Sequence, residues 1–248
     1  MIFETVLTVS ESKRLIAKAV AAMPAIRNAL STGTVAVPTG STNGYIVEEL
    51  TGEKIDKPKF VTGATLPANV PRDGLLSRDL PDLVLVRGRS VMIPAVDAIK
   101  DMKAGDVFIK GANALHYESR TAGILIAHPT GGTIGATIGT IISRRITLVV
   151  PVGLEKNIAA PPADVARFMR GERDGSATSL WPIQPNELVT EIEALKILTG
   201  VEAMQSGAGG LAGAEGATWL VVRGTHQQIE DAKRLLDSIH GEPPFIRR

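Results

Sequence analysis

The sequence lacks cysteine, has few aromatic residues and carries no large excess of charge of either sign. The absence of cysteine excludes disulfide bonds, thiol nucleophiles and thiolate metal sites, so stability must come from packing. Aromatic residues make up 4% of the chain, too few for a base-stacking platform. The net charge of +1 argues against binding to nucleic acid or membranes, which requires clustered lysine and arginine. We therefore expect no nucleic acid and no membrane among the partners.

The remaining composition is that of an ordinary globular α/β protein, with 248 residues of which 44% are hydrophobic. Residues 1–10 show no basic leader followed by an apolar segment, so we expect a cytoplasmic protein. Residues 123–142 carry no formal charge, but His128 and Pro129 interrupt them and glycine and threonine dilute them. We interpret this stretch as a strand, a loop and a packed helix. A homo-oligomer is the default expectation for this class and size.

Apolar periodicity predicts strands alternating with helices through the first part of the chain. Strands are expected at 34–37, 59–62, 83–86, 106–110, 123–127 and 147–150. Helices are expected from Ser10 to Gly33 with an interruption at Pro24, from Asn43 to Leu50, and at 94–103 and 134–143. This alternation predicts a mostly parallel, doubly wound sheet with helices on both faces.

A more compact pattern begins near residue 178. It predicts strands at 179–183, 201–205, 218–223 and 244–246 and helices at 186–199 and 226–240. The order β-α-β-β-α-β is that of a small ferredoxin-like α+β domain. We therefore expect an α/β core domain at 1–155, a connection at 156–177 with a short helix at 163–170, and the small domain at 178–248.

The segment 34–50, TVAVPTGSTNGYIVEEL, predicts an anion-binding turn between a buried strand and a helix. The first amides of a helix lack internal partners, and the peptide dipoles favour negative charge there. The alternative is that a hydroxyl of the turn only caps the helix. Ligands of parallel sheets sit at the carboxyl ends of the strands, where this turn would meet 110–113 and 128–133. The predicted ligand-binding residues are Thr39, Gly40, Ser41, Thr42, Asn43, Gly111, Asn113, His128, Thr130, Gly131, Gly132 and Thr133.

These motifs carry a family resemblance. VAVPTGSTNGYIVEEL resembles the GTGST strand-loop-helix of ribose-5-phosphate isomerases and of the related glucosamine-phosphate isomerase and CoA-transferase group. GDVFIKGANAL resembles the DGAD-bearing strand of those isomerases and of methylthioribose-phosphate isomerases. HPTGGTIGATIGTIISRRITLVVPVG is similar to a glycine-threonine helix and Val-Pro strand late in that fold. The resemblance spans residues 30–155 and implies an isomerase/CoA-transferase-like fold that binds a phosphorylated sugar or related anion.

The departures from the family pattern bear on activity. Sugar-phosphate isomerisation needs a carboxylate that moves a proton, and the DGAD aspartates do much of this work in the family. Lys110 and Asn113 occupy the matching positions here, and an amide cannot exchange a proton near neutral pH. We therefore expect the usual catalytic carboxylates to be replaced. Lys110 is a candidate for ligand contact or catalysis, or a strand-end lysine in solvent. Glu118 is the candidate general base, or a solvated surface glutamate.

Other motifs are weaker. Histidines 116, 128, 226 and 240 show no metal-ligand spacing, and neither a dinucleotide fingerprint nor a Walker motif is present, so we expect no cofactor and no metal. Arginines 72, 78, 87 and 89 could reach an anion. Three hypotheses follow: a site for a small anionic metabolite, an acyl- or CoA-transfer enzyme that uses Glu118, and a non-catalytic regulatory or assembly protein. The sequence leaves open whether the protein is an enzyme.

Overall fold

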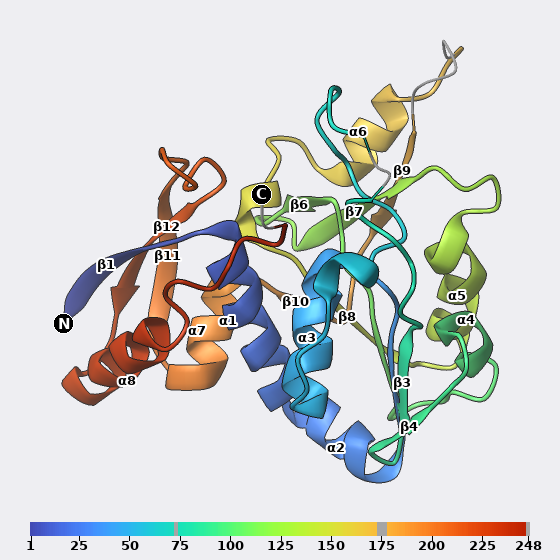
Figure 1. Ribbon diagram of the computed structural model, residues 1–248, viewed down its shortest axis with the longest axis horizontal. Coiled ribbons are helices and arrows are strands. Elements are labelled where there is room, and N and C mark those ends of the chain that lie inside the picture. Colours follow the sequence, from blue (N-terminus) through green and yellow to red (C-terminus); the bar gives the residue numbers. More distant parts are fainter. Residues whose placement is uncertain (72–73, 173–177, 247–248) are drawn as a thin grey trace.

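The computed structural model describes residues 1–71, 74–172 and 178–246. Arg72 and residues 173–177 of the expected connection therefore lie outside the described part of the chain. The described residues form an α/β fold with one six-stranded mixed sheet and two three-stranded antiparallel sheets (Figure 1).

The elements have the following bounds. The helices are α1 (Val9–Ala22), α2 (Pro24–Thr32), α3 (Ser41–Thr51), α4 (Ala95–Ala98), α5 (Gly132–Ser143), α6 (Pro162–Phe168), α7 (Glu191–Thr199) and α8 (His226–Asp237), with 3-10 turns η1 (Lys57–Lys59) and η2 (Leu154–Lys156). The strands are β1 (Ile2–Leu7), β2 (Thr34–Val37), β3 (Leu83–Val86), β4 (Arg89–Val91), β5 (Val107–Ile109), β6 (Ala114–His116), β7 (Thr121–Ile126), β8 (Thr147–Pro151), β9 (Ser179–Ile183), β10 (Glu187–Val189), β11 (Glu202–Ala208) and β12 (Thr218–Arg223).

The six-stranded sheet has the order β10-β8-β5-β2-β3-β4. The pairings from β10 to β2 are parallel, and those of β2 with β3 and β3 with β4 are antiparallel. Helices α1, α2 and α3 lie on one side of this sheet, and α4 and α5 lie on the other (Figure 1). The expectation of a mostly parallel sheet with helices on both faces is thereby confirmed, while the isomerase-like identity of the fold stays a prediction.

Strand β7 occupies an unexpected place. Its apolar run is a strand, as predicted, but it pairs antiparallel with β6 and β9 in a separate sheet. The short turn from Tyr117 to Arg120 joins β6 and β7 as a hairpin, so their pairing is local. Residues 128–133 therefore do not follow a strand of the main sheet, and the expectation that they extend its carboxyl edge was wrong.

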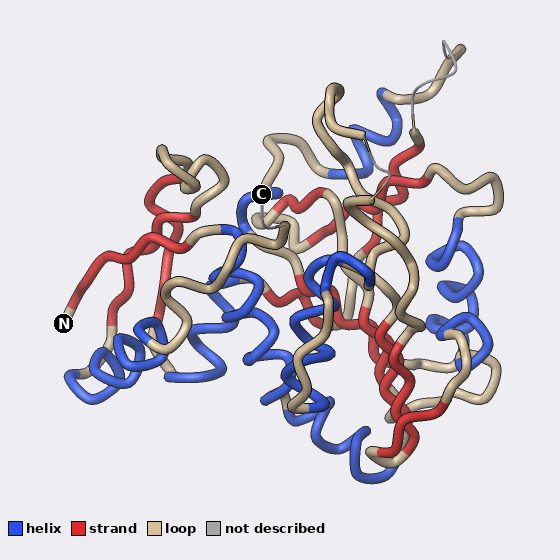
Figure 2. Tube along the Cα trace, in the orientation of Figure 1, coloured by secondary structure: helices blue, strands red, loops and turns tan. Residues whose placement is uncertain are grey.

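The C-terminal region also differs from the expected ferredoxin-like order. β9 pairs with β7, and β10 pairs with β8. β1, at the N-terminus, pairs with β12 in the three-stranded sheet β1-β12-β11, which Figure 2 shows at the left. The predicted helix at 186–199 is a strand followed by a helix, because Thr190 caps α7 in a capping box with Glu193. Residues 244–246 form no strand, and residues 59–62 contribute a 3-10 turn and an isolated bridge at Phe60.

Helix α1 lies between α3, beside the six-stranded sheet, and α7, which precedes β11. It packs against α3 on one side and α7 on the other, with Leu15, Ile16, Ala19 and Val20 fully buried. The side-chain oxygen of Thr8 caps its first turn in a capping box with Glu11, and Pro24 begins α2 after a break. Across the described ranges, no helix is both long and apolar enough to cross a lipid bilayer.

Candidate anion-binding site

The turn between β2 and α3 leaves helix amides without partners. Gly40 precedes α3, and no side chain caps the helix, so the predicted alternative of a simple hydroxyl cap does not hold. Within the described residues, the amides of Ser41, Thr42 and Asn43 donate no hydrogen bond. The positive end of an eleven-residue helix is therefore available to an anion.

Asp82 and Thr62 hold the turn in place. The Asp82 carboxylate accepts hydrogen bonds from the Thr39 amide at 3.0 Å and from the Ala95 amide at 2.9 Å. The Thr39 hydroxyl bonds to the Thr62 hydroxyl at 2.6 Å, so this predicted ligand residue is engaged within the protein. Asp82 lies directly before β3, at the end of the long loop that follows η1. No local sequence pattern links Asp82 to the turn at residues 38–42.

Asn43 joins the turn to the end of β5. Its buried side-chain nitrogen donates to the Pro38 carbonyl at 2.8 Å and to the Ile109 carbonyl at 3.5 Å. Its Oδ1 atom is buried, with no donor in the part of the chain that the structure describes. Asn43 therefore has a structural role that the sequence did not reveal, and two of the three predicted segments, 38–42 and 110–113, do lie together.

Three lysines from separate elements gather at this place. Lys110 Nζ donates to the Gly111 carbonyl at 3.2 Å, and Lys156 Nζ donates to the neighbouring Ala112 carbonyl at 2.9 Å. Lys13, on α1, is 9% exposed, and its Nζ lies 5.2 Å from the centre of the Phe245 ring. Among the described residues, no carboxylate lies within ion-pair distance of any of the three. We call Lys13, Lys110 and Lys156 the lysine cluster.

The ammonium groups of the lysine cluster influence one another. Burial, followed by the charge of Lys156, lowers the pKa of Lys110 to about 8. Burial and Lys156 also lower the pKa of Lys13 to about 8, although the Glu155 carboxylate partly opposes them. Concentrated positive charge without a paired acid is unfavourable in the free protein, and an anion would relieve it. Sequence reasoning found Lys110 alone, because Lys13 and Lys156 are distant along the chain.

A cavity of about 390 Å³ opens beside the lysine cluster. Its lining includes the polar residues Lys13, Lys156, Ser41 and Asn113, but not Lys110. Its other lining residues are Val61, Gly63, Ala64, Thr65, Leu66, Leu76, Leu125, Phe245 and Ile246. Ser41 and Asn113 were predicted from the sequence. The cavity is large enough for a metabolite-sized ligand.

Two carboxyl groups, Glu155 and Glu191, lie close to the segments that carry Lys13 and Lys156. Glu191 is fully buried and accepts hydrogen bonds from the Leu154 amide at 2.9 Å and the Thr218 hydroxyl at 3.5 Å. Burial, followed by the Glu155 carboxylate, raises the pKa of Glu191. Glu155 Oε2 is itself buried without a described hydrogen-bond partner. These glutamates are the acids that sequence reasoning missed near the site, and Glu155 is the one whose charge reaches Lys13.

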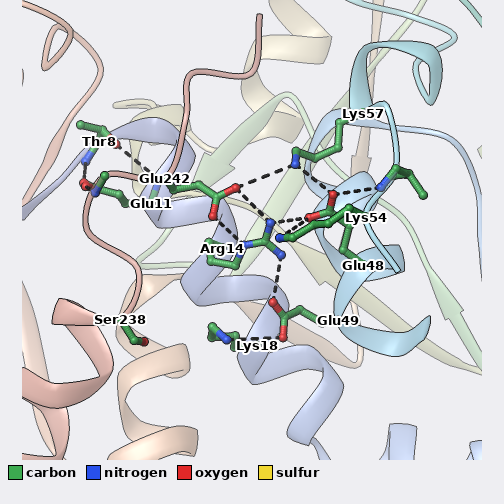
Figure 3. Close-up of polar contacts among 12 residues, drawn as sticks. Thr8, Glu11, Arg14, Lys18, Glu48, Glu49, Lys54, Lys57, Ser238 and Glu242 are labelled. Carbon is green, nitrogen blue, oxygen red and sulfur yellow. Dashed lines mark hydrogen bonds and ion pairs between the residues drawn. The ribbon is translucent and has the colours of Figure 1, made fainter. Parts of the chain in front are cut away.

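The C-terminal segment that lines the cavity is held by a buried ion network around Arg14 (Figure 3). Arg14 pairs with Glu48, with Glu49 at 2.9 Å and with Glu242 at 2.9 Å. Lys57 also pairs with Glu48, at 3.1 Å. Burial acts to raise the pKa of Glu48, but Arg14, an amide and Lys57 outweigh it and lower the pKa to about 2. The network therefore anchors the segment that carries Phe245 onto α1 and α3.

The other predicted residues lie elsewhere. None of residues 128–133 lines the cavity; His128 bonds to Thr130, and Gly131 lies beside the Trp181 ring. Glu118 is exposed in the turn between β6 and β7, away from the cavity lining. Arg78 pairs with Asp82 at 3.5 Å. Arg87 and Arg89 are exposed and do not line the cavity. The described residues contain no group of acidic residues or histidines arranged to hold a metal ion.

Comparisons with protein-family models, with curated proteins and with solved structures found no match. The resemblance to sugar-phosphate isomerases and CoA-transferases therefore rests on the sequence motifs alone.

Proposed function

We propose that this protein binds a small anionic metabolite, phosphorylated or carboxylated, between the lysine cluster and the N-terminus of α3. The observation that carries the proposal is the lysine cluster itself, three cations with no described carboxylate at ion-pair distance, of which Lys13 and Lys156 line one cavity. Phosphate and carboxylate are the common biological groups that satisfy several ammonium ions at once.

The helix end supports the same conclusion independently. Ser41 lines the cavity at the first residue of α3, where the amides of residues 41–43 have no described acceptor. A helix N-terminus and lysines that face the same space favour the same sign of charge. The isomerase-like resemblance of the turn agrees with a phosphorylated ligand, and the replacement of the family's aspartates by Lys110 and Asn113 favours binding or a diverged reaction.

The proposal leaves the chemical step open. Acyl transfer through Glu118 gains no support, because Glu118 is exposed and absent from the cavity lining. Glu155 does not line the cavity either, but its charge acts on Lys13. A regulatory role that follows from ligand binding without reaction is equally compatible with the proposal.

Calorimetric titration with inorganic phosphate in a chloride buffer tests the proposal. The wild-type protein should bind phosphate, and Lys156→Met should weaken binding by about tenfold to a hundredfold, since a hydrogen bond to a charged group contributes roughly 1.5–3 kcal/mol. Ser41→Ala should weaken binding less, because the helix amides remain.

Lys103→Met is the matched control, because Lys103 is exposed and does not line the cavity. It should bind phosphate as the wild type does. If phosphate, sulfate and acetate all fail to bind the wild type, or if Lys156→Met and Lys103→Met behave alike, the lysine cluster is not an anion site.

A further inference from the structure

The cavity beside the lysine cluster is lined by two chemically different kinds of residue. Lys13, Lys156, Ser41 and Asn113 supply its polar groups. Most of the remaining lining residues are aliphatic or aromatic, namely Val61, Leu66, Leu76, Leu125, Phe245 and Ile246. A ligand that fills the cavity therefore contacts both charged and apolar groups.

Contacts with α1 and α3 hold the C-terminal part of the apolar lining. The Phe245 ring lies 6.4 Å from the Tyr45 ring and 5.2 Å from Lys13 Nζ, so it borders both α3 and the lysine cluster. The segment before it is held by Glu242 on Arg14 and by the Gly241 amide, which donates to Glu11 at 2.8 Å. Leu125 reaches the cavity from β7, on a different sheet. The apolar lining thus converges from three separate parts of the chain.

A polyhydroxylated ligand fits this lining poorly. Each buried hydroxyl needs a hydrogen-bond partner, and its burial without one is unfavourable. Apart from Lys13, Lys156, Ser41 and Asn113, Thr65 is the one lining residue with a polar side chain, and the other side chains of the lining are hydrocarbon. A chain of methylene groups or an aromatic ring needs no such partner, and its removal from water is favourable.

We propose that the ligand is an amphiphilic anion, a carboxylate or phosphate ester whose charged end meets the lysine cluster and whose short aliphatic or aromatic portion packs against Leu66, Leu125 and Phe245. This inference rests on the proposed anion site and narrows it. The charged end resembles that of a sugar phosphate, but the body of the ligand is hydrocarbon.

Calorimetric titration with two sets of probes tests the inference. Acetate, butyrate and hexanoate carry the same charge and differ only in chain length, so affinity should rise about fourfold per added methylene while the chain is being buried. Hexyl phosphate and ribose 5-phosphate share the phosphate group, and hexyl phosphate should bind at least about tenfold more tightly.

Leu125→Ser provides the matched variant, because Leu125 is 40% exposed and its replacement spares the core. It should weaken hexanoate binding and leave acetate and phosphate binding unchanged. Leu211→Ser, at an 86% exposed leucine outside the cavity lining, should change neither.

The outcomes separate the two proposals. If acetate and hexanoate bind equally, or ribose 5-phosphate binds more tightly than hexyl phosphate, the amphiphilic ligand is wrong while the anion site stands. If none of the probes, including inorganic phosphate, binds the wild type, both proposals are wrong.

Discussion

Replacement of Lys13 by methionine should stabilise the ligand-free protein. Lys13 is 9% exposed, and its environment lowers its pKa from 10.5 to about 8. That difference corresponds to about 3 kcal/mol of unfavourable free energy for the charged side chain in the fold. Loss of the contact with Phe245 offsets about 1 kcal/mol of the gain. We therefore expect a net increase of about 2 kcal/mol, or about 4–8 °C in Tm for a chain of this length.

The pH dependence of this gain distinguishes its cause. Below pH 8 the amine is charged in both the folded and the unfolded state, so the wild type bears the full cost. Between pH 8 and 10.5 the folded state releases its proton first, and the cost declines with rising pH. Above 10.5 the amine is neutral in both states, so the advantage of Lys13→Met should vanish.

Urea denaturation of the wild type and of Lys13→Met, near neutral pH and again near pH 10, measures this difference in a phosphate-free buffer. Lys103→Met, at an exposed lysine, should change stability by less than about 0.5 kcal/mol at either pH. The reasoning is refuted if Lys13→Met is less stable than the wild type near neutral pH, or if its gain is the same at both pH values.

Two further predictions concern the scaffold. Arg14→Leu should lower the free energy of unfolding by about 3–5 kcal/mol, because Glu48 would remain as a buried carboxylate without its main partner. Urea denaturation measures this change. A decrease of less than about 1 kcal/mol would contradict a stabilising role for the ion network around Arg14. Gly131→Ala should lower the Tm, because Gly131 has φ +85° and an added Cβ would lie 3.1 Å from Trp181, at a cost of about 1–3 kcal/mol. Gly139→Ala, in open space within helix α5, which Gly131 precedes as its N-cap, should instead be neutral or stabilising. Equal Tm changes in the two variants would contradict the strain at Gly131.

The sequence by itself determined the local elements whose signals are strong. Pro24 separated α1 from α2, and the turn after β2 began a helix, because these depend on the geometry of a few neighbouring residues. A local pattern also contradicts the predicted helix at 186–199. Thr190 and Glu193 form a capping box that marks the start of α7, so residues 187–189 lie before the helix and form β10.

Only the tertiary structure decided which strands share a sheet. The apolar run at 123–127 predicts a strand but does not identify its partners, because hydrogen bonds between strands depend on residues distant in the chain. For the same reason the sequence did not predict that β1 pairs with β12, which lies almost the full length of the chain away. Nor did it predict that residues 128–133 lie outside the cavity lining.

The site shows the same division. Residues 38–43 identified the helix end and its preference for negative charge, since that preference is a property of local backbone geometry. Lys13 and Lys156 joined Lys110, and Phe245 came to face them, only through the packing of α1, η2 and the C-terminal segment. Charge and hydrocarbon can be counted in a sequence, but their arrangement around one cavity is set by contacts between segments far apart along the chain.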